Sequence, residues 1–251
     1  MHCACKLAST VPTLRVSRRG SSFLALGALL LISAAVMLAY PAQKKSAGSV
    51  FVAEKGKLNI LLDGKSIGHE EFEISSTAGG WVAKGTTHIT PEGTPATTVT
   101  GNLTLQPDGV PVSYEWSSQA DKTNGAHILF ANGVAKMTVQ LQGARPFEQD
   151  LTFSSPLILV LDDNLYYQYA VLARVYDWNR RGTQTFSVLI PQELLPGTIS
   201  VDWAGAVTAD GKSFEGLKVA TSDLQVILYL DSNHRLMRLE VPSSKAAVVR
   251  E

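Results

Sequence analysis

The densest group of side chains that could bind a ligand lies between residues 162 and 181, in the sequence DDNLYYQYAVLARVYDWNRR. Aromatic rings with polar tips often line ligand sites, and neighbouring guanidinium groups can bind an anionic head group. The segment therefore indicates a binding lip at the end of a helix, formed by Tyr166, Tyr169, Tyr176, Trp178, Arg180 and Arg181. The alternative is that the aromatic rings plug one end of a barrel while the arginines lie in a solvated turn.

Four histidines in the larger, C-terminal part of the chain are the other candidates for chemistry: His69, His88, His127 and His234. His88 and His127 lie on expected strands, where cross-strand pairing could bring them together, and His69 precedes two glutamates that could act as ligands or bases. None of them has the spacing of a metal site. We therefore predict no catalytic residue, no metal ligand and no cofactor, and keep an enzyme with a dispersed site as an alternative.

Known catalytic and nucleotide-binding motifs do not occur in the chain. Gly64-Lys65-Ser66 and Gly211-Lys212-Ser213 lack the earlier glycine that a phosphate-binding loop requires, and each falls between two expected strands. The patterns typical of dinucleotide, zinc-hydrolase, calcium and serine-esterase sites are also missing. A non-enzymatic role is therefore favoured.

The charge distribution argues against nucleic acid as a partner. Six of the 22 basic side chains precede the first acid, Glu54, so 16 basic and all 22 acidic side chains follow residue 45. Phosphate backbones are held by several lysine or arginine contacts that displace counterions. An acidic domain without a basic stripe lacks the lysine and arginine contacts needed to bind a phosphate backbone.

An uncharged run over residues 23–40, FLALGALLLISAAVMLAY, predicts a transmembrane or signal helix. About 18 helical residues nearly cross a hydrocarbon core. The basic tail, residues 1–22, would stay on the cytoplasmic side, which places the C-terminal domain in the periplasm or outside the cell. Whether the segment is cleaved stays open. Both cysteines, Cys3 and Cys5, lie in the tail, so the exported domain is expected to have no disulfide.

Residues 41–56 are small, polar and aperiodic, as in a linker, and residues 57–242 have the pattern of a β-rich domain that a tail, 243–251, follows. Runs rich in Val, Ile, Thr and aromatic residues recur about every ten residues. Turn pairs separate them, of which Asn132-Gly133 is the clearest hairpin signal. Asn124-Gly125 and Asp210-Gly211 predict further turns. The segment indicates an antiparallel meander.

Alternation at Gly101, Leu103 and Leu105 predicts a sheet with one buried face. One helix is expected over residues 163–176, with Asp162 or Asp163 as its cap, because apolar residues recur there at helical spacing. More than about ten strands cannot stay flat. The expected fold is mainly β, a curved antiparallel half-barrel or open barrel with one central helix, preceded by the transmembrane or signal helix.

Four segments carry a resemblance: LNILLDGKSIGHEEFEI, LDDNLYYQYAVLARVYD, QTFSVLIPQE and LYLDSNHRLMRLEVP. In their order the chain resembles uncharacterised bacterial envelope proteins with a large curved antiparallel sheet, similar in architecture to the half-barrels of periplasmic lipoprotein carriers. The resemblance implies a fold and a compartment and no catalytic residues. The chain differs from the carriers in having one helix in place of several lid helices.

Three functions are therefore carried forward. The first is an envelope protein whose concave sheet face binds a lipid or another amphiphile, with the aromatic residues at its mouth. The second is a module held at the membrane through residues 23–40 that recruits another envelope protein. The third is the enzyme with a dispersed site.

Overall fold

The computed structural model describes residues 48–120, 122–192, 194–221 and 224–251. All of its elements lie in one compact unit, Lys45–Glu251, which has its own core and so meets the criteria for a part that folds alone. The basic tail and the apolar run over residues 23–40 fall outside the described residues. Within the described part, no helix is both long enough and apolar enough to span a membrane.

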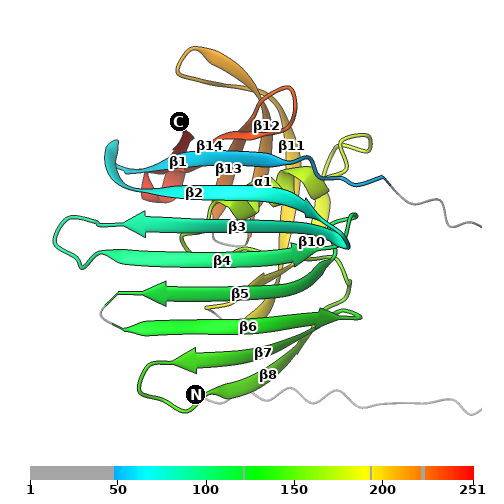
Figure 1. Ribbon diagram of the computed structural model, residues 1–251. Helices are drawn as coiled ribbons and strands as arrows, with labels where there is room; N and C mark the ends of the chain where they lie inside the picture. The colour runs from blue at the N-terminus through cyan, green and yellow to red at the C-terminus, as the bar shows by residue number, and fades with distance from the viewer. Residues whose placement is uncertain (1–47, 121, 193, 222–223) are drawn as a thin grey trace, which may run out of the picture. The chain divides into compact units, whose positions relative to one another are not determined.

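The unit is built on one sheet of 15 strands, drawn in Figure 1. In chain order the strands are β1 (Glu54–Leu62), β2 (Lys65–Thr77), β3 (Gly80–Ile89), β4 (Thr97–Leu105), β5 (Pro111–Gln119), β6 (Thr123–Ala131), β7 (Val134–Leu141), β8 (Phe147–Thr152), β9 (Ile158–Val160), β10 (Gln184–Ile190), β11 (Leu195–Ala209), β12 (Lys212–Ala220), β13 (Gln225–Leu230), β14 (Leu236–Val241) and β15 (Ala246–Arg250). A helix, α1 (Tyr167–Val175), follows β9, and a short 3-10 helix, η1 (Pro242–Ser244), precedes β15. Within the described residues, the prediction of a mainly β fold with one α-helix is confirmed.

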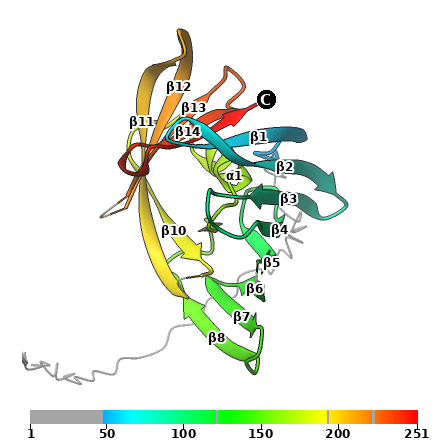
Figure 2. The ribbon, with the colours of Figure 1, turned by 90° about the vertical axis from the view of Figure 1, so that its left-hand side faces the viewer.

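The strands pair with their chain neighbours almost throughout, as expected of a meander. The spatial order runs from β8 through β1 to β15 and on to β9, and each described pair is antiparallel apart from β9 with β10. The sheet bends so that its two halves face each other across α1 (Figure 2). It does not close, because its edge strands β8 and β9 are not paired with each other. Gln149 Nε2 on β8 donates to the backbone oxygen of Leu194 at 3.2 Å across this opening.

The ordered sheet extends past both predicted boundaries, 57 and 242. β1 begins at Glu54, inside the expected linker, and β15 occupies residues that we expected to be a tail. Strand β15 pairs with β1 on one side and β14 on the other, and Val248 is buried between them. A strand of only five residues, AAVVR, has little pattern of its own, so only its long-range pairing reveals it.

Turn chemistry shapes most of the hairpins as predicted. Asn132 and Gly133 have φ angles of 51° and 77°, and Asp210 and Gly211 have 49° and 72°, which are the positive angles that a tight two-residue turn needs. The predicted turn at Asn124-Gly125 is wrong, because both residues lie inside β6. A Cβ on Gly125 would come within 2.8 Å of the backbone oxygen of Trp116, so this glycine permits close approach of two strands.

The buried face of the sheet follows the predicted alternation and packs on α1. Gly101, Leu103 and Leu105 are buried, while Asn102 between them is exposed, which confirms the inward phase of β4. The helix lies within the range predicted for it and contributes buried side chains to the same core, among them Tyr167 and Leu172. Its expected cap is wrong, because neither aspartate caps it and Tyr166 occupies the N-cap position.

Candidate functional site

A buried carboxylate on β2 takes the place of the missing cap on α1. Glu70 is fully buried, and its two carboxylate oxygens accept the backbone N–H groups of Tyr166 at 2.6 Å and Tyr167 at 2.8 Å. Thr87 on β3 donates its hydroxyl to the same carboxylate at 3.3 Å. Burial raises the pKa of Glu70 to about 7, although these three hydrogen bonds act in the opposite direction. The sheet therefore holds the start of the helix through one side chain.

A second polar cluster also lies inside the curve of the sheet. Tyr114 donates its hydroxyl to Asp162 Oδ2 at 2.5 Å and accepts a hydrogen bond from Gln168 Nε2 at 3.0 Å. Burial raises the pKa of the Asp162 carboxyl well above its ordinary value. A Cβ on Gly101 would come within 2.9 Å of the hydroxyls of both Tyr114 and Tyr167. Side chains of the helix and sheet therefore fill the interior at this point.

The six residues of the predicted lip do not form one site. Tyr166 and Tyr169, at the start of α1, are partly buried and pack against the core. Burial raises the pKa of Tyr169 to about 12. At the other end of the helix, Tyr176 is buried and donates its hydroxyl to the backbone oxygen of Gly182 at 2.6 Å. The predicted lip residues therefore lie in two groups, one at each end of the helix.

The second group packs against the turn between β13 and β14 and against the long strands β11 and β12. Trp178 stacks on His234 with ring centroids 3.7 Å apart, and Arg181 lies over the ring of Trp203 at 4.3 Å. Glu215 pairs with His234 at 3.1 Å and with Arg181 at 3.8 Å. Arg180 is exposed and uses its backbone N–H to bind Asp177. These rings and charges are engaged with one another.

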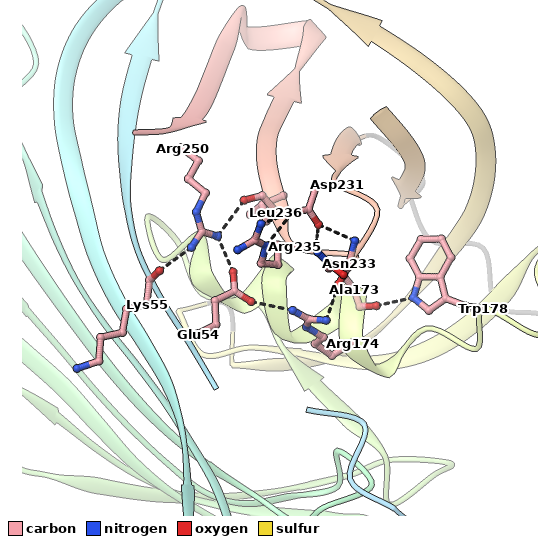
Figure 3. Close-up of polar contacts among 10 residues, drawn as sticks. All are labelled: Glu54, Lys55, Ala173, Arg174, Trp178, Asp231, Asn233, Arg235, Leu236 and Arg250. Atoms are coloured by element: carbon pink, nitrogen blue, oxygen red, sulfur yellow. Dashed lines mark hydrogen bonds and ion pairs between the residues drawn. The ribbon is translucent and has the colours of Figure 1, made fainter. Parts of the chain in front are cut away.

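An ion-pair cluster that we did not predict joins the helix to both ends of the unit (Figure 3). Glu54 at the start of β1 pairs with Arg174 of α1 at 3.0 Å and with Arg250 of β15 at 2.5 Å. Its side chain is 3% exposed. Arg174 also donates to the backbone oxygen of Asn233, and Arg250 to that of Lys55. The cluster is a structural junction, because the groups that it contacts lie on β1, on β15 and in the turn between β13 and β14.

The four histidine candidates lie in three separate places. His69 and His88 lie side by side on β2 and β3, with ring centroids 5.4 Å apart. His127 lies near Glu115 at 4.0 Å, on β6, three strand spacings from β3, or about 14 Å. In the part of the chain that the structure covers, no three histidine, cysteine, aspartate or glutamate side chains come together as metal ligands.

A hollow of about 1100 Å³ lies along β2–β7. Strand register identifies its floor as one row of directly paired residues: Glu71, Thr86, Thr100, Ser117, Gly125 and Gln140. Each is exposed or half-buried, whereas Phe72 and the glycines of the intervening row lie against the core or the helix. The hollow is therefore on the outer face of the sheet, away from α1.

A second outward row forms one wall of this hollow. We call the hollow, with its two rows, the outer groove. Its members alternate in charge along part of their length: Lys55, Glu73, Lys84, Asn102, Glu115 and His127. The loop between β7 and β8, including Ala144 and Pro146, borders the far end. There Thr123 donates its backbone N–H to Gln142 Oε1 at 2.6 Å. Of the twelve residues in the two rows, the sequence singles out three: His127, Glu71 as one of the two glutamates after His69, and Gly125 as part of a predicted turn.

The alternating pattern alone identifies these positions as outward. What the sequence lacks is the register that aligns them across six strands, since each strand contributes only one or two polar residues to the outer groove. The outer groove therefore needs no sequence motif, and a search for motifs could not find it.

No protein-family model matches the chain, and no curated protein matches it. Among solved structures, a β-barrel-like protein of the domain of unknown function DUF1849 from Brucella abortus is similar, with a TM-score of 0.53 at 12% identity over 80% of this chain and 95% of that one. A DUF1089 family protein from Pseudomonas aeruginosa has a TM-score of 0.41 at 8% identity, over 67% and 87% of the two chains. The first likeness shows the fold alone. The chain thus shares its β-barrel-like fold with an uncharacterised bacterial protein, which confirms that part of the resemblance seen in the sequence.

Proposed function

We propose that this chain is a non-catalytic binding module of the bacterial cell envelope and that it binds its ligand in the outer groove. The observation that carries the proposal is the hollow of about 1100 Å³ on β2–β7. Its volume is just above the usual range for small-molecule sites, about 300–1,000 Å³. The small residues on its floor, Thr86, Thr100, Ser117 and Gly125, leave room for a ligand.

The location rests on the sequence. The uncharged run over residues 23–40, with basic residues before it, favours export or anchoring of the C-terminal unit. The net acidic character of the unit makes a nucleic acid an unfavourable ligand.

The concave face is the second candidate, as in the lipoprotein-carrier likeness. Its appeal is that Tyr166 and Tyr169 lie where the helix begins, between the halves of the sheet. Two observations make it the weaker site. Tyr167 occupies the space over Gly85 and Gly101, and the described inward residues form one contiguous core. A lipid there would have to displace side chains.

The test uses residues 45–251 incubated with an extract of bacterial envelopes, followed by native mass spectrometry. Ser117→Trp introduces a large ring on the floor of the groove at an exposed strand position, where aromatic residues are favoured. Thr208→Trp, also exposed but on β11, is the matched control. We expect a bound mass on the wild type and on Thr208→Trp and its loss from Ser117→Trp.

Two results contradict the proposal. One is the absence of a bound mass from all three proteins. The other is a bound mass that survives Ser117→Trp. If that mass is instead lost from Tyr169→Ala, the ligand occupies the concave face and the carrier-like function replaces ours.

A further inference from the structure

The charges beside the outer groove already compensate one another. Lys55 and Lys84 each approach Glu73 at 3.1 Å, and these two lysines lower the pKa of its carboxyl. Glu115 has His127 as its neighbour. With three carboxylates and two lysines along the two rows, counting Glu71, the groove has no excess of positive charge with which to hold a polyanion.

The floor is built from side chains that both donate and accept hydrogen bonds. Thr100 and Ser117 face each other across β4 and β5 with their hydroxyl oxygens 2.6 Å apart. Thr86 and Gln140 add a hydroxyl and an amide. The outward positions of the two rows hold polar or charged side chains and one glycine, and the imidazole of His127 is their one aromatic ring. Apolar residues of the lining, among them Leu141 and Pro146, lie outside the rows, so a hydrocarbon chain lying along the rows would contact mainly polar groups. Hydroxyls and amides match a ligand that carries many hydroxyl groups.

The backbone of this region is not free to bind a peptide as an added strand. Each of β2–β7 has a paired neighbour on both sides, which uses its N–H and C=O groups in the sheet. Strand addition needs an unpaired edge. A ligand in the outer groove therefore meets side chains, and it lies across the strands.

The polar groups recur at the spacing between strands, about 4.8 Å, over a length of about 24 Å from β2 to β7. A ligand that uses this row must offer polar groups repeatedly along its length. From these observations, and resting on the proposed function, we propose that the outer groove binds an uncharged oligosaccharide chain lying across β2–β7.

The experiment follows backbone amide signals of ¹⁵N-labelled residues 45–251 by NMR during titration with three uncharged probes, maltohexaose, cellohexaose and hexa-N-acetylchitohexaose. We expect saturable shifts from at least one probe at Thr100, Ser117 and Gly125. Ser117→Trp should weaken that binding at least tenfold, and Thr208→Trp should leave it unchanged.

Comparison probes separate this inference from the proposed function. Dodecylphosphocholine and a mixed-sequence decapeptide are titrated in the same way. If either of these probes shifts the groove signals and no oligosaccharide does, the ligand class is wrong. The proposal of a binding module would then be unaffected. The ligand class also fails if no oligosaccharide shifts the groove signals while Ser117→Trp removes a bound envelope compound. Silence from every probe, together with no bound envelope mass, refutes both.

Discussion

Glu70 is expected to make the stability of this protein rise as the pH falls from 8 to 5. Its pKa is about 7 in the folded state, against an ordinary value of 4.5 for an exposed glutamate. The folded state therefore holds the proton more tightly than the unfolded state. This contribution is complete below pH 4.5 and is lost as the pH rises through 7.

The two pKa values give the magnitude. Between pH 8 and pH 5 the free energy of unfolding should increase by about 2–3 kcal/mol from this one group. Glu70→Gln removes the titration while keeping the shape of the side chain. The amide can accept only one of the two N–H groups of Tyr166 and Tyr167, so the variant also carries a pH-independent loss of about 1–3 kcal/mol.

The assay is urea unfolding of residues 45–251 at several pH values between 5 and 8, with tryptophan fluorescence as the signal. Other groups titrate as well, including Asp162, so the measured quantity is the difference between wild type and variant at each pH. Glu71→Gln, on the exposed face next in sequence, is the control and should retain the wild-type pH profile. A difference between wild type and Glu70→Gln that stays constant with pH would refute the reasoning.

Three further changes test the packing of the fold by thermal or urea unfolding. Gly101→Ala places a methyl group within 3 Å of side chains of the sheet and helix, so it should cost about 1–3 kcal/mol, whereas Gly79→Ala, with open space around it, should cost far less; equal effects would contradict the packing described. Glu54→Ala leaves two largely buried guanidinium groups without their carboxylate and should cost about 3–5 kcal/mol, whereas Glu73→Ala, whose ion pairs are exposed, should cost far less; similar losses would contradict the role of the Glu54 cluster as a junction. Gly133→Ala should cost about 1 kcal/mol because φ is 77° there, and an unchanged midpoint would argue against that turn.

The polar groups inside the curve of the sheet argue against the concave face as the site of an apolar ligand. Glu70 and Asp162 lie inside the curve of the sheet, where a carrier would be expected to offer apolar surface. Both are engaged with the helix or with Tyr114. Buried polar groups that are hydrogen-bonded fix the position of the elements that they join. Their arrangement is consistent with an interior that holds α1 in place.

Local physical chemistry was enough for much of the fold. The pairs Asp63-Gly64 and Asn132-Gly133 turn the chain because their own φ angles favour a hairpin, whatever lies around them. Alternation along β4 and the helical spacing around Leu172 depend only on residues that are close in sequence. The sequence by itself therefore determined a mainly β chain with one helix in the middle.

Long-range pairing decided the rest. The alternation along β2 predicts that Glu70 points inward, since it is in phase with Phe72 and Ile74. Nothing in the sequence near Glu70 indicates that it caps a helix almost a hundred residues later. Likewise, Glu54 finds Arg250 only because the first strand pairs with the last. The outer groove depends on the register of six strands, which no single strand encodes. Local patterns specify which face a side chain occupies, whereas its neighbours on that face are selected by the energy of the whole sheet.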